Sequence, residues 1–552
     1  MPTTVIVGAV AAGMSAATRL RRLDEDHEII VLEAGEHVSF ANCGLPYYVG
    51  GVIPERESLL LQTPQSLRAR FDLDVRVNSR VVAVDADAHT VTVRSADRGP
   101  YDLTYDHLVL SPGARPIVPD VPGAERALVL RDVADVDRMA DAVAGARSAV
   151  VVGAGFVGLE VAENLAHRGL SVTVVELAPQ VLGALDSELA IRVQDRLEEH
   201  GVRVLTGSTV SEISAADVTV AGPDGSHRID ADLVVAAIGV TPDSTLAASA
   251  GASLGPRGAV LVDDDMRTSV PGVYAVGDVA AKRDALDDGP VLIPLANLAN
   301  RHGRRVADVI AGRGGRGRGA IGTAVVGVFG LTAAVAGRTE RRLIAEGRAY
   351  RAIHTHPADH AGYYPGATQM ALKLLVDPDT DEILGAQGVG EAGVDKRIDV
   401  IATAMMGGIT ASELADLELT YAPAYGSAKD PVNMLGYVAE NAATGETPSL
   451  QWHELAAAAD EPVVLDVRTE AEHDRGTVEV PWQSPLVIPV DELRERHGEL
   501  PRGRRVVVHC QVGQRGHTAT RLLRQLGHDA VNLDGGWLTW RDGRRTLVPA
   551  RA

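Results

Sequence analysis

Cysteine is nearly absent from this chain, because its 552 residues include only two, Cys43 and Cys510. They lie in segments that we expect to belong to different domains, which excludes a framework of structural disulfides. Basic residues are outnumbered by acidic ones, 53 against 74, and the net charge is -21. A surface of this sign repels nucleic acids and anionic lipids at long range, so we expect neither as a partner.

Long apolar runs are also missing, and no stretch has the length needed to cross a membrane. The apolar residues 5–14 follow no basic segment and lead into a glycine-containing helix start, unlike a secretory signal. These features predict a protein of the reducing cytoplasm. The chain is too long for one hydrophobic core, so we expect three or four domains.

Two segments show the strand-helix-strand pattern of a nucleotide-binding unit. The first has predicted strands at 4–7 and 28–33 around a helix at 12–23. The second has predicted strands at 148–152 and 171–176 around a helix at 158–167. Two such units in one chain predict two nucleotide cofactors.

The second unit contains G-x-G-x-x-G, formed by Gly153, Gly155 and Gly158. Glycines at these positions let backbone amides and a helix N-terminus approach a pyrophosphate closely. Glu176 closes the next strand, where a carboxylate accepts hydrogen bonds from an adenosine ribose and repels a 2'-phosphate. The unit therefore predicts an NADH site, with NADPH as the less favoured cofactor.

The first unit keeps only the outer glycines of the pattern, Gly8 and Gly13, and has Val10 in the middle. Glu33 compensates, because it ends the second strand where an acid can hold the ribose of a dinucleotide. After residue 322, strand-like stretches such as 369–376 and a helix near 396–406 predict an α+β domain.

The segment Ser39-Phe-Ala-Asn-Cys-Gly-Leu-Pro-Tyr47 resembles that of coenzyme A-disulfide reductases, which are flavoproteins. The resemblance covers residues 1 to about 440. It extends to Ala-Gly-Tyr-Tyr-Pro-Gly at 361–366, Tyr421-Ala-Pro-Ala-Tyr425 and Lys429-Asp-Pro-Val-Asn433. It assigns FAD to the first unit, with a second FAD motif at 268–278 and connecting motifs at 108–113 and 234–239. The glycines and acid that end these motifs are Gly113, Gly239, Gly277 and Asp278.

The resemblance implies that Cys43 is the catalytic thiol. Relatives of the glutathione reductase type use two cysteines separated by four residues, but here the corresponding positions are Tyr48 and Val38. Any disulfide of Cys43 must therefore include an outside thiol. In the family, two tyrosines of the partner subunit assist the thiol chemistry, and motif position carries these roles to Tyr363 and Tyr421, which implies a homodimer.

A thiolate is the form that attacks sulfur, and we expect a nearby oxidised flavin to stabilise it at Cys43. A tyrosine hydroxyl can then protonate the departing thiolate. An inert buried cysteine is the alternative. The resemblance also implies that coenzyme A contacts Ser15, Arg19, Arg22, Ser39, Asn42 and Lys429. No metal site is expected, and we interpret His354, His356 and His360 as ordinary loop and strand histidines.

Cys510 ends a predicted strand at 506–510 and opens the loop Cys510-Gln-Val-Gly-Gln-Arg-Gly516 before a helix predicted at 517–526. Loop amides can surround the sulfur, and the helix dipole favours its anion. The loop, Asp466-Val-Arg468 and Asn532-Leu-Asp-Gly-Gly-Trp537 resemble rhodaneses, which implies sulfane sulfur on Cys510 and an anion guide at Arg515. A phosphatase is the alternative, but phosphatase loops carry five residues between Cys and Arg, and this loop has four.

The expected fold is α/β, with two Rossmann-like nucleotide-binding domains for FAD and NAD, an α+β dimerisation domain and a C-terminal α/β rhodanese-like domain. The expected boundaries are 1–118 and 241–320 for FAD, 119–240 for NAD(P)H, 321–440 for dimerisation, 441–452 for a linker and 453–552 for the rhodanese-like domain.

The expected function is NAD(P)H-dependent reduction of coenzyme A disulfide, coenzyme A persulfide or polysulfide through a mixed disulfide or persulfide of Cys43. The rhodanese-like domain would carry sulfane sulfur. The sequence does not rank these substrates or glutathione persulfide. Two alternatives remain open: a flavin NADH oxidase or peroxidase that uses a cysteine sulfenic acid, and a sulfur-binding redox sensor with slow turnover.

Overall fold

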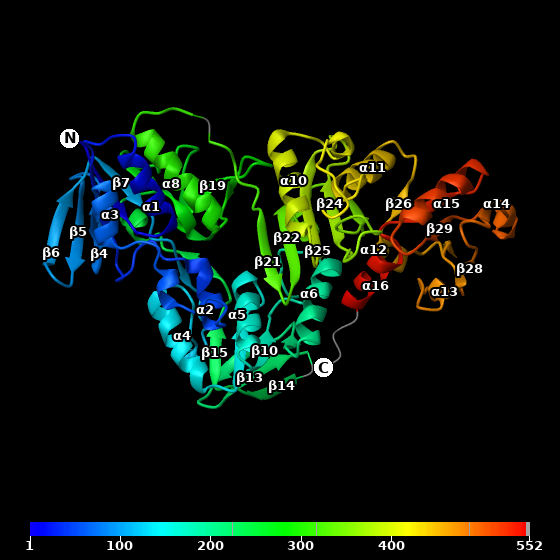
Figure 1. The fold of residues 1–552 in the computed structure, drawn as a ribbon, viewed down its shortest axis with the longest axis horizontal. Coiled ribbons are helices and arrows are strands. Elements are labelled where there is room, and N and C mark those ends of the chain that lie inside the picture. Colours follow the sequence, from blue (N-terminus) through cyan, green and yellow to red (C-terminus); the bar gives the residue numbers. More distant parts are fainter. Residues whose placement is uncertain (224, 316, 485, 548–552) are drawn as a thin grey trace. The chain divides into compact units, whose positions relative to one another are not determined.

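The computed structural model describes residues 1–223, 225–315, 317–484 and 486–547 (Figure 1). The chain divides into two compact units, Met1–Leu177 with Gly201–Gly322 and Ala178–His200 with Thr323–Ala552. Each unit has its own sheets. Among the described residues, no helix has both the length and the hydrophobicity that crossing a bilayer requires.

The first sheet of unit 1 is parallel, with the strand order β18-β7-β1-β2-β3. Its strands are β1 (Thr3–Val7), β2 (Glu28–Leu32), β3 (Asp74–Arg76), β7 (His107–Leu110) and β18 (Val273–Ala275). Helix α1 (Ala11–Arg21) connects β1 to β2 and packs against α8 (Ala296–Ile310). The β-branched run of β1 is buried on both faces, as a central parallel strand requires.

The second sheet of unit 1 has the order β11-β10-β9-β15 and is also parallel. It consists of β9 (Ser148–Val152), β10 (Ser171–Val175), β11 (Arg203–Leu205) and β15 (Leu233–Ala236), with α5 (Phe156–His167) between β9 and β10. The other helices of unit 1 are α2 (Leu45–Val49), α3 (Pro64–Phe71), α4 (Val133–Gly145) and α7 (Thr245–Ser249). Smaller sheets contain β4 (Ser79–Asp85), β5 (Thr90–Ser95), β6 (Gly99–Thr104), β8 (Ala114–Pro116), β12 (Thr209–Ile213), β13 (Asp217–Gly222), β14 (Gly225–Asp230), β16 (Val240–Pro242), β17 (Val260–Leu261), β19 (Ala280–Arg283) and β20 (Pro290–Val291).

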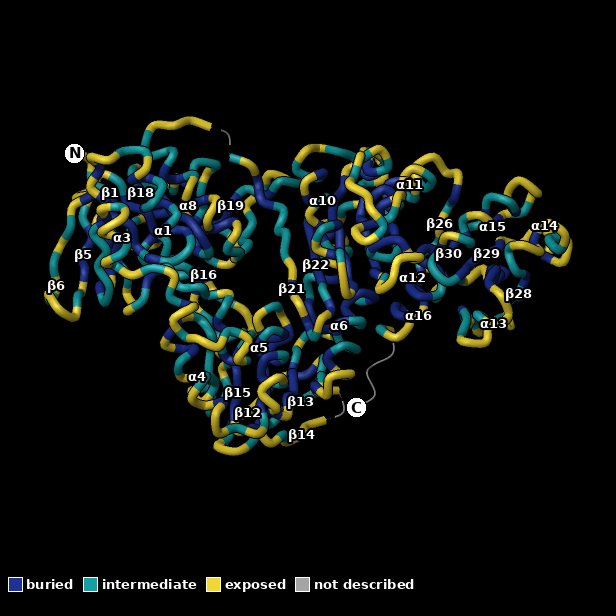
Figure 2. Tube along the Cα trace, viewed as in Figure 1, coloured by how far each residue is buried: buried dark blue, intermediate teal, exposed yellow. Residues whose placement is uncertain are grey.

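Unit 2 contains an antiparallel sheet of order β21-β22-β25-β24-β23. The strands are β21 (Ala324–Val328), β22 (Leu331–Gly337), β23 (Arg351–Thr355), β24 (Ala371–Val376) and β25 (Ile383–Gly390). The accompanying helices are α6 (Ser187–Glu199), α9 (Glu340–Glu346), α10 (Val394–Gly407) and α11 (Pro431–Ala443). Figure 2 shows that β22 and β25 are largely buried, so this sheet forms the centre of its domain.

The C-terminal part of unit 2 is a parallel sheet of order β26-β30-β29-β27-β28. The strands are β26 (Ser449–Leu450), β27 (Val463–Asp466), β28 (Leu486–Val487), β29 (Val506–His509) and β30 (Ala530–Leu533). The helices are α12 (Trp452–Ala456), α13 (Glu470–His473), α14 (Leu493–Arg496), α15 (Gln514–Gln525) and α16 (Gly536–Thr546).

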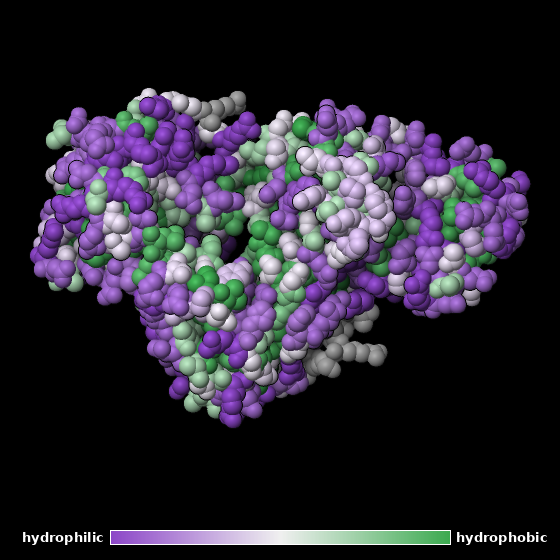
Figure 3. Space-filling model, viewed as in Figure 1, coloured by the Kyte–Doolittle hydropathy of each residue, from purple (hydrophilic) through white to green (hydrophobic). Residues whose placement is uncertain are grey.

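Hydrophilic side chains cover most of the visible face of the molecule (Figure 3).

The expected domain boundaries stay predictions, and two segments near them are worth describing. Residues 178–200, expected in the NAD(P)H domain, are part of unit 2. Within the expected linker 441–452, α11 continues to Ala443 and β26 begins at Ser449, so regular structure reaches into both of its ends. Residues 548–552 of the expected rhodanese-like domain lie outside the described residues.

Candidate active sites

The loop between β1 and α1 has the form of a dinucleotide site. Gly8 has a φ of +98°, and a Cβ there would lie 2.1 Å from the Ser111 carbonyl oxygen. A Cβ on Gly13 would lie 1.9 Å from the Gly8 carbonyl oxygen, so only glycine permits the close approach of helix and strand. Glu33 Oε2 accepts a hydrogen bond from the Ala9 amide at 2.9 Å. Loop amides, a helix N-terminus and a carboxylate thus meet at the end of the sheet, which fits a pyrophosphate and a ribose.

The missing middle glycine does not oppose this assignment. Val10 has a φ of -112° and Gly155, at the same place in the second unit, has a φ of -79°. Both values are open to any L-residue, so a side chain at this position causes no backbone strain.

The later FAD motifs converge on the same end of the sheet. Gly277 opens a 3-10 helix (Gly277–Val279) together with Asp278, and a Cβ on Gly277 would lie 3.3 Å from the Ala12 Cβ at the start of α1. Lys282 Nζ donates to the Gly277 carbonyl at 3.2 Å, and burial lowers the pKa of Lys282 to about 8. Gly113 and Gly239 flank the antiparallel pair β8 and β16, which joins the two connecting segments.

The loop between β9 and α5 repeats the arrangement. Gly153 has a φ of +103°, and a Cβ on Gly158 would lie 2.0 Å from its carbonyl oxygen. A Cβ on Gly155 would meet no described atom within 4 Å, so the middle of the loop is open. Glu176 Oε2 accepts a hydrogen bond from the Ala154 amide at 2.6 Å. The loop fits a second dinucleotide.

Cys43 lies in a 3-10 helix (Asn42–Gly44) and is exposed. Its Sγ is 3.9 Å from Asn42 Oδ1. Desolvation, followed by the negative charges of Glu160 and Asp278, raises the pKa of the Cys43 thiol. These residues oppose the thiolate, so the stabilisation that we expected for it does not come from them.

Tyr47 and Glu160 belong to this site and were missed from the sequence. The Tyr47 hydroxyl donates to Glu160 Oε1 at 3.3 Å. Burial and Glu160 raise the pKa of Tyr47 to about 12, and burial raises the pKa of Glu160. The available signals were the place of Tyr47 at the end of the cysteine motif and of Glu160 two residues after Gly158.

The residues expected to contact coenzyme A in unit 1 lie in two places. Ser15 and Arg19 share one face of α1, and Arg22, three residues after Arg19, is the residue at the C-terminal end of this helix. Ser15 Oγ donates to Asn300 Oδ1 at 2.5 Å, Arg19 pairs with Asp308 at 2.7 Å, and the Arg22 guanidinium is 5.9 Å from the centre of the Phe71 ring. Ser39, with Asn42, lies in the cysteine loop, and its amide donates to the Ala9 carbonyl at 2.8 Å.

Tyr363 and Tyr421 come together in unit 2, with their hydroxyl oxygens 2.9 Å apart. The side chains are 76% and 48% exposed, which leaves the pair accessible to a partner. The hydrogen bond between the two hydroxyls raises the pKa of Tyr363. Tyr425 and Lys429, which follow in the chain, are also exposed.

Cys510 lies in the loop between β29 and α15 and is 0% exposed. The helix begins at Gln514 rather than at the expected residue 517, because the loop ends at Gly513, which has a φ of +90°. The Trp537 amide donates to the Cys510 carbonyl at 2.8 Å. The loop is therefore held from the side of α16.

Arg515 faces a carboxylate in the structure. Its two terminal nitrogens donate to the two oxygens of Glu472 at 2.8 and 2.5 Å, and this hydrogen bonding lowers the pKa of Glu472 to about 2. Arg468, which sequence reasoning did not assign to the site, donates to Gln511 Oε1 at 3.1 Å and stacks over the Trp537 ring at 5.2 Å. The cations around Cys510 are thus held in place by fixed partners.

Family models match three consecutive parts of the chain. The model of pyridine nucleotide-disulphide oxidoreductases matches residues 2–303, and that of their dimerisation domain matches residues 323–430. The chain belongs to the pyridine nucleotide-disulphide oxidoreductase family. A rhodanese-like domain model matches residues 449–542. The predicted α/β fold class is confirmed, as is an oxidoreductase of the coenzyme A-disulfide reductase type with a C-terminal rhodanese-like domain.

Members of this family with related sequences include the coenzyme A disulfide reductase of Staphylococcus haemolyticus, 35% identical over 80% of this chain and 100% of that protein. The structure of reduced CoADR-RHD from Bacillus anthracis is 43% identical, with a TM-score of 0.95 over 98% of both chains. An NAD-dependent persulfide reductase from A. fulgidus is 37% identical, with a TM-score of 0.90 over 98% of this chain and 100% of its own. The family implies FAD and NAD(P)H as cofactors.

Proposed function

We propose that this oxidoreductase uses NADH to reduce coenzyme A persulfide, and also coenzyme A disulfide or polysulfide, at Cys43. The observation that carries the proposal is a single, exposed cysteine in the reductase part of a chain that also contains a rhodanese-like loop around Cys510. Sulfane sulfur is the substrate that both parts share.

The proposed reaction begins at Cys43 and ends with the release of hydrogen sulfide. The Cys43 thiolate attacks the outer sulfur of coenzyme A persulfide, forming a Cys43 persulfide and releasing coenzyme A thiol after protonation. Two electrons and two protons then break the new sulfur-sulfur bond and release hydrogen sulfide. A flavin held by the loop at Gly8 and Gly13 would supply the transfer of these electrons from NADH. With coenzyme A disulfide, the same attack forms a mixed disulfide and releases one coenzyme A thiol.

Residues of this chain hold and move the protons. We assign proton donation to the departing sulfur to Tyr363 and Tyr421 from the second subunit of a homodimer, because their hydroxyls are paired and exposed. Ser15, Arg19, Arg22, Ser39, Asn42 and Lys429 would bind coenzyme A. Arg19 would have to exchange Asp308 for a phosphate.

Cys510 would carry sulfane sulfur as a persulfide, in a loop whose amides and helix N-terminus favour an anion. A flavin NADH oxidase or peroxidase is the second candidate, because a water-forming NADH oxidase from Lactobacillus brevis is 26% identical over 81% of this chain. That likeness covers less of the chain than the 98% covered by the persulfide reductase. The reductase is therefore favoured.

The test mixes the purified protein with NADH and coenzyme A persulfide under nitrogen and measures sulfide release over many turnovers. Wild type and Cys510→Ser should release sulfide, and Cys43→Ser should not. Sulfide release that survives in Cys43→Ser would refute the single-cysteine mechanism. NADH consumption that requires air would favour the oxidase, and a single turnover would favour a sensor.

A further inference from the structure

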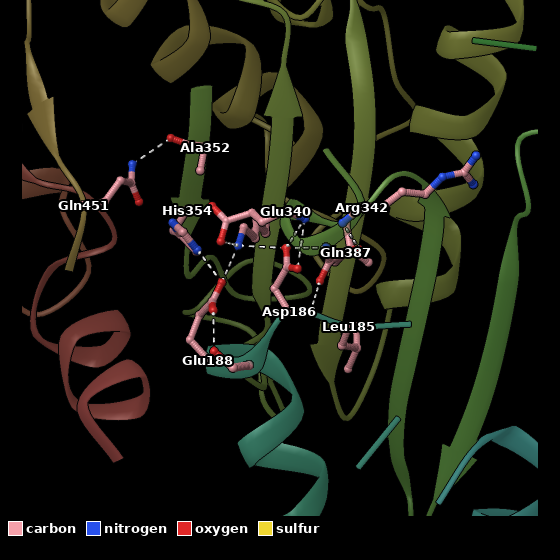
Figure 4. Close-up of polar contacts among 12 residues, drawn as sticks. Leu185, Asp186, Glu188, Glu340, Arg342, Ala352, His354, Gln387 and Gln451 are labelled. Atoms are coloured by element: carbon pink, nitrogen blue, oxygen red, sulfur yellow. Dashed lines mark hydrogen bonds and ion pairs between the residues drawn. The ribbon is translucent and has the colours of Figure 1, made fainter. Parts of the chain in front are cut away.

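His354 of β23 lies between two carboxylates that come from different parts of unit 2. Its amide and its Nδ1 contact Asp534 Oδ2 at 2.9 and 2.6 Å, and its Nε2 contacts Glu188 Oε1 at 3.0 Å. Figure 4 shows the His354 ring directed towards Glu188. The side chains of all three residues are buried. Since both ring nitrogens face carboxylates, the imidazole is positioned to donate on both sides as an imidazolium.

The Glu188 side of this contact is rigid. Lys373 is 0% exposed, and its Nζ lies 2.5 Å from Glu188, 2.9 Å from Asp186 and 3.1 Å from Glu340. These three carboxylates have the grouping of a metal site, but the ammonium of Lys373 forms an ion pair with each of them. Burial opposes the charge, yet the three carboxylates raise the pKa of Lys373 well above its usual value. The cluster is therefore an anchor for His354 rather than a cation site.

The Asp534 side leads to the sulfur-transfer loop. Asp534 lies between β30 and α16, and the amides of Trp537 and Leu538 donate to the carbonyls of Cys510 and Gln511 at 2.8 and 3.1 Å. A Cβ on Gly536 would lie 2.6 Å from the Cys510 carbonyl oxygen, so this turn has no free space against the loop. Residues 534–538 thus contact His354 on one side and the Cys510 loop on the other.

A second histidine contacts the same region as the His354–Asp534 pair. His356 follows directly after the end of β23, two residues after His354, and its Nε2 is 2.8 Å from Thr539 Oγ1 of α16. Farther along α16, Arg545 pairs with Asp195 of α6 through bonds of 2.7 and 2.5 Å. The first turn of α16 is therefore held by His356, and its last turn is held by α6.

We propose that His354 is a positioning residue for sulfur transfer at Cys510, because it holds Asp534 and through it the turn that shapes the Cys510 loop. This inference rests on the proposed sulfur-carrying role of Cys510. If so, sulfur transfer by the rhodanese-like domain depends on a residue of the dimerisation domain. The Cys510 loop would then have its active conformation only when the rhodanese-like domain is packed against β23. His354 would touch neither the substrate nor the transferred sulfur.

The substitutions that separate positioning from general stability are His354→Asn and His354→Gln. An asparagine amide can replace the Nδ1 donor towards Asp534, whereas a glutamine amide can replace only the Nε2 donor towards Glu188. In the full-length flavoprotein we expect His354→Gln to lower kcat for sulfur transfer from thiosulfate to cyanide by about 10-fold, because a displaced loop misplaces the sulfur. His354→Asn should stay near the wild type. NADH-dependent reduction of coenzyme A disulfide, which uses Cys43, should be unchanged in both variants.

Arg545→Gln is the matched control, because it weakens the docking of α16 at the far end and leaves the turn at 534–538 in place. Equal losses in Arg545→Gln and His354→Gln, or wild-type sulfur transfer in His354→Gln, would overturn the inference. If His354→Gln does not fold, Asp534→Asn is measured instead and should show the same selective loss. A wild type that transfers no sulfur from thiosulfate or coenzyme A persulfide would refute the proposed role of Cys510 itself, and with it this inference.

Discussion

The hydroxyl of Tyr47 lies 3.3 Å from Oε1 of Glu160, although 113 residues separate them in the chain. Tyr47 is on α2, four residues after Cys43, and Glu160 is on α5, whose N-terminus follows the second dinucleotide loop. The two helices pack closely, since a Cβ on Gly50 would lie 1.9 Å from Asn164 Oδ1. This contact links the expected nicotinamide site to Cys43, the proposed catalytic thiol.

Replacing Glu160 with glutamine should lower the pKa of the Cys43 thiol. Desolvation raises that pKa first, and the charge of Glu160 raises it further, so removing the charge leaves only part of the shift. We expect Cys43 to react several-fold faster with iodoacetamide near neutral pH, because more of it is thiolate. The measurement is the pH profile of alkylation in a reduced Cys510→Ser background.

The control for this charge effect is Glu125→Gln, which removes an exposed carboxylate elsewhere in unit 1. An alkylation profile that shifts equally in both variants would mean that net charge, rather than Glu160, sets the reactivity of Cys43.

The choice between NADH and NADPH should depend on Glu176. Its carboxylate accepts a hydrogen bond from the Ala154 amide at 2.6 Å, at the place where a ribose is held. Glu176→Gln can keep that hydrogen bond and loses the charge that repels a 2'-phosphate. We expect kcat/KM for NADPH relative to NADH to rise about 10-fold, which is about 1.4 kcal/mol. Glu212→Gln, on the exposed face of β12, should leave the ratio unchanged.

Local sequence patterns predicted those parts of the structure that are formed by residues close together in the chain. The glycine loops and the acids Glu33 and Glu176 lie within two strand-helix-strand units, where spacing alone fixes their geometry. Local patterns could not predict that residues 178–200 pack with unit 2. It follows from long-range packing around Lys373, and the only local signal is a lysine within the fully buried strand β24.

Contacts between distant residues were accessible only through the family resemblance. Tyr363 and Tyr421 are 58 residues apart and were paired by motif, and the structure brings their hydroxyls together. His354 and Asp534 are 180 residues apart, and no local pattern distinguishes a strand histidine that forms a buried ion pair from one that does not. Side-chain partners set by tertiary packing are the part that periodicity and spacing leave undetermined.

The stability of unit 2 should fall at alkaline pH through His354. Burial lowers the pKa of His354, but hydrogen bonds to Asp534 and Glu188 outweigh burial and raise it to about 9, even with Lys373 nearby. Because the folded-state pKa lies above the ordinary value, the stabilisation is complete below about pH 6.5 and is lost as the pH rises through 9. A loss of 1 kcal/mol lowers the Tm of a unit of this size by about 2–4 °C.

This dependence is measured by thermal unfolding of the wild type and His354→Asn across that pH range. The wild type should lose more stability between neutral and alkaline pH than the variant, which has no group titrating at this position. Parallel curves for the two proteins would show that His354 does not titrate there and that another group causes any alkaline loss.

The two tyrosine hydroxyls should act as one unit in thiol release. They are 2.9 Å apart, so removing either one leaves the other without its hydrogen-bond partner. Tyr363→Phe and Tyr421→Phe should each lower kcat for coenzyme A disulfide by about 10–100-fold, and the double variant should lose less than the product of the two effects. Tyr425→Phe, from the same exposed segment, should stay within about 2-fold of the wild type, since such surface changes are usually small. Losses that multiply in the double variant would assign the two hydroxyls to separate steps and would remove the basis for a shared proton at this pair.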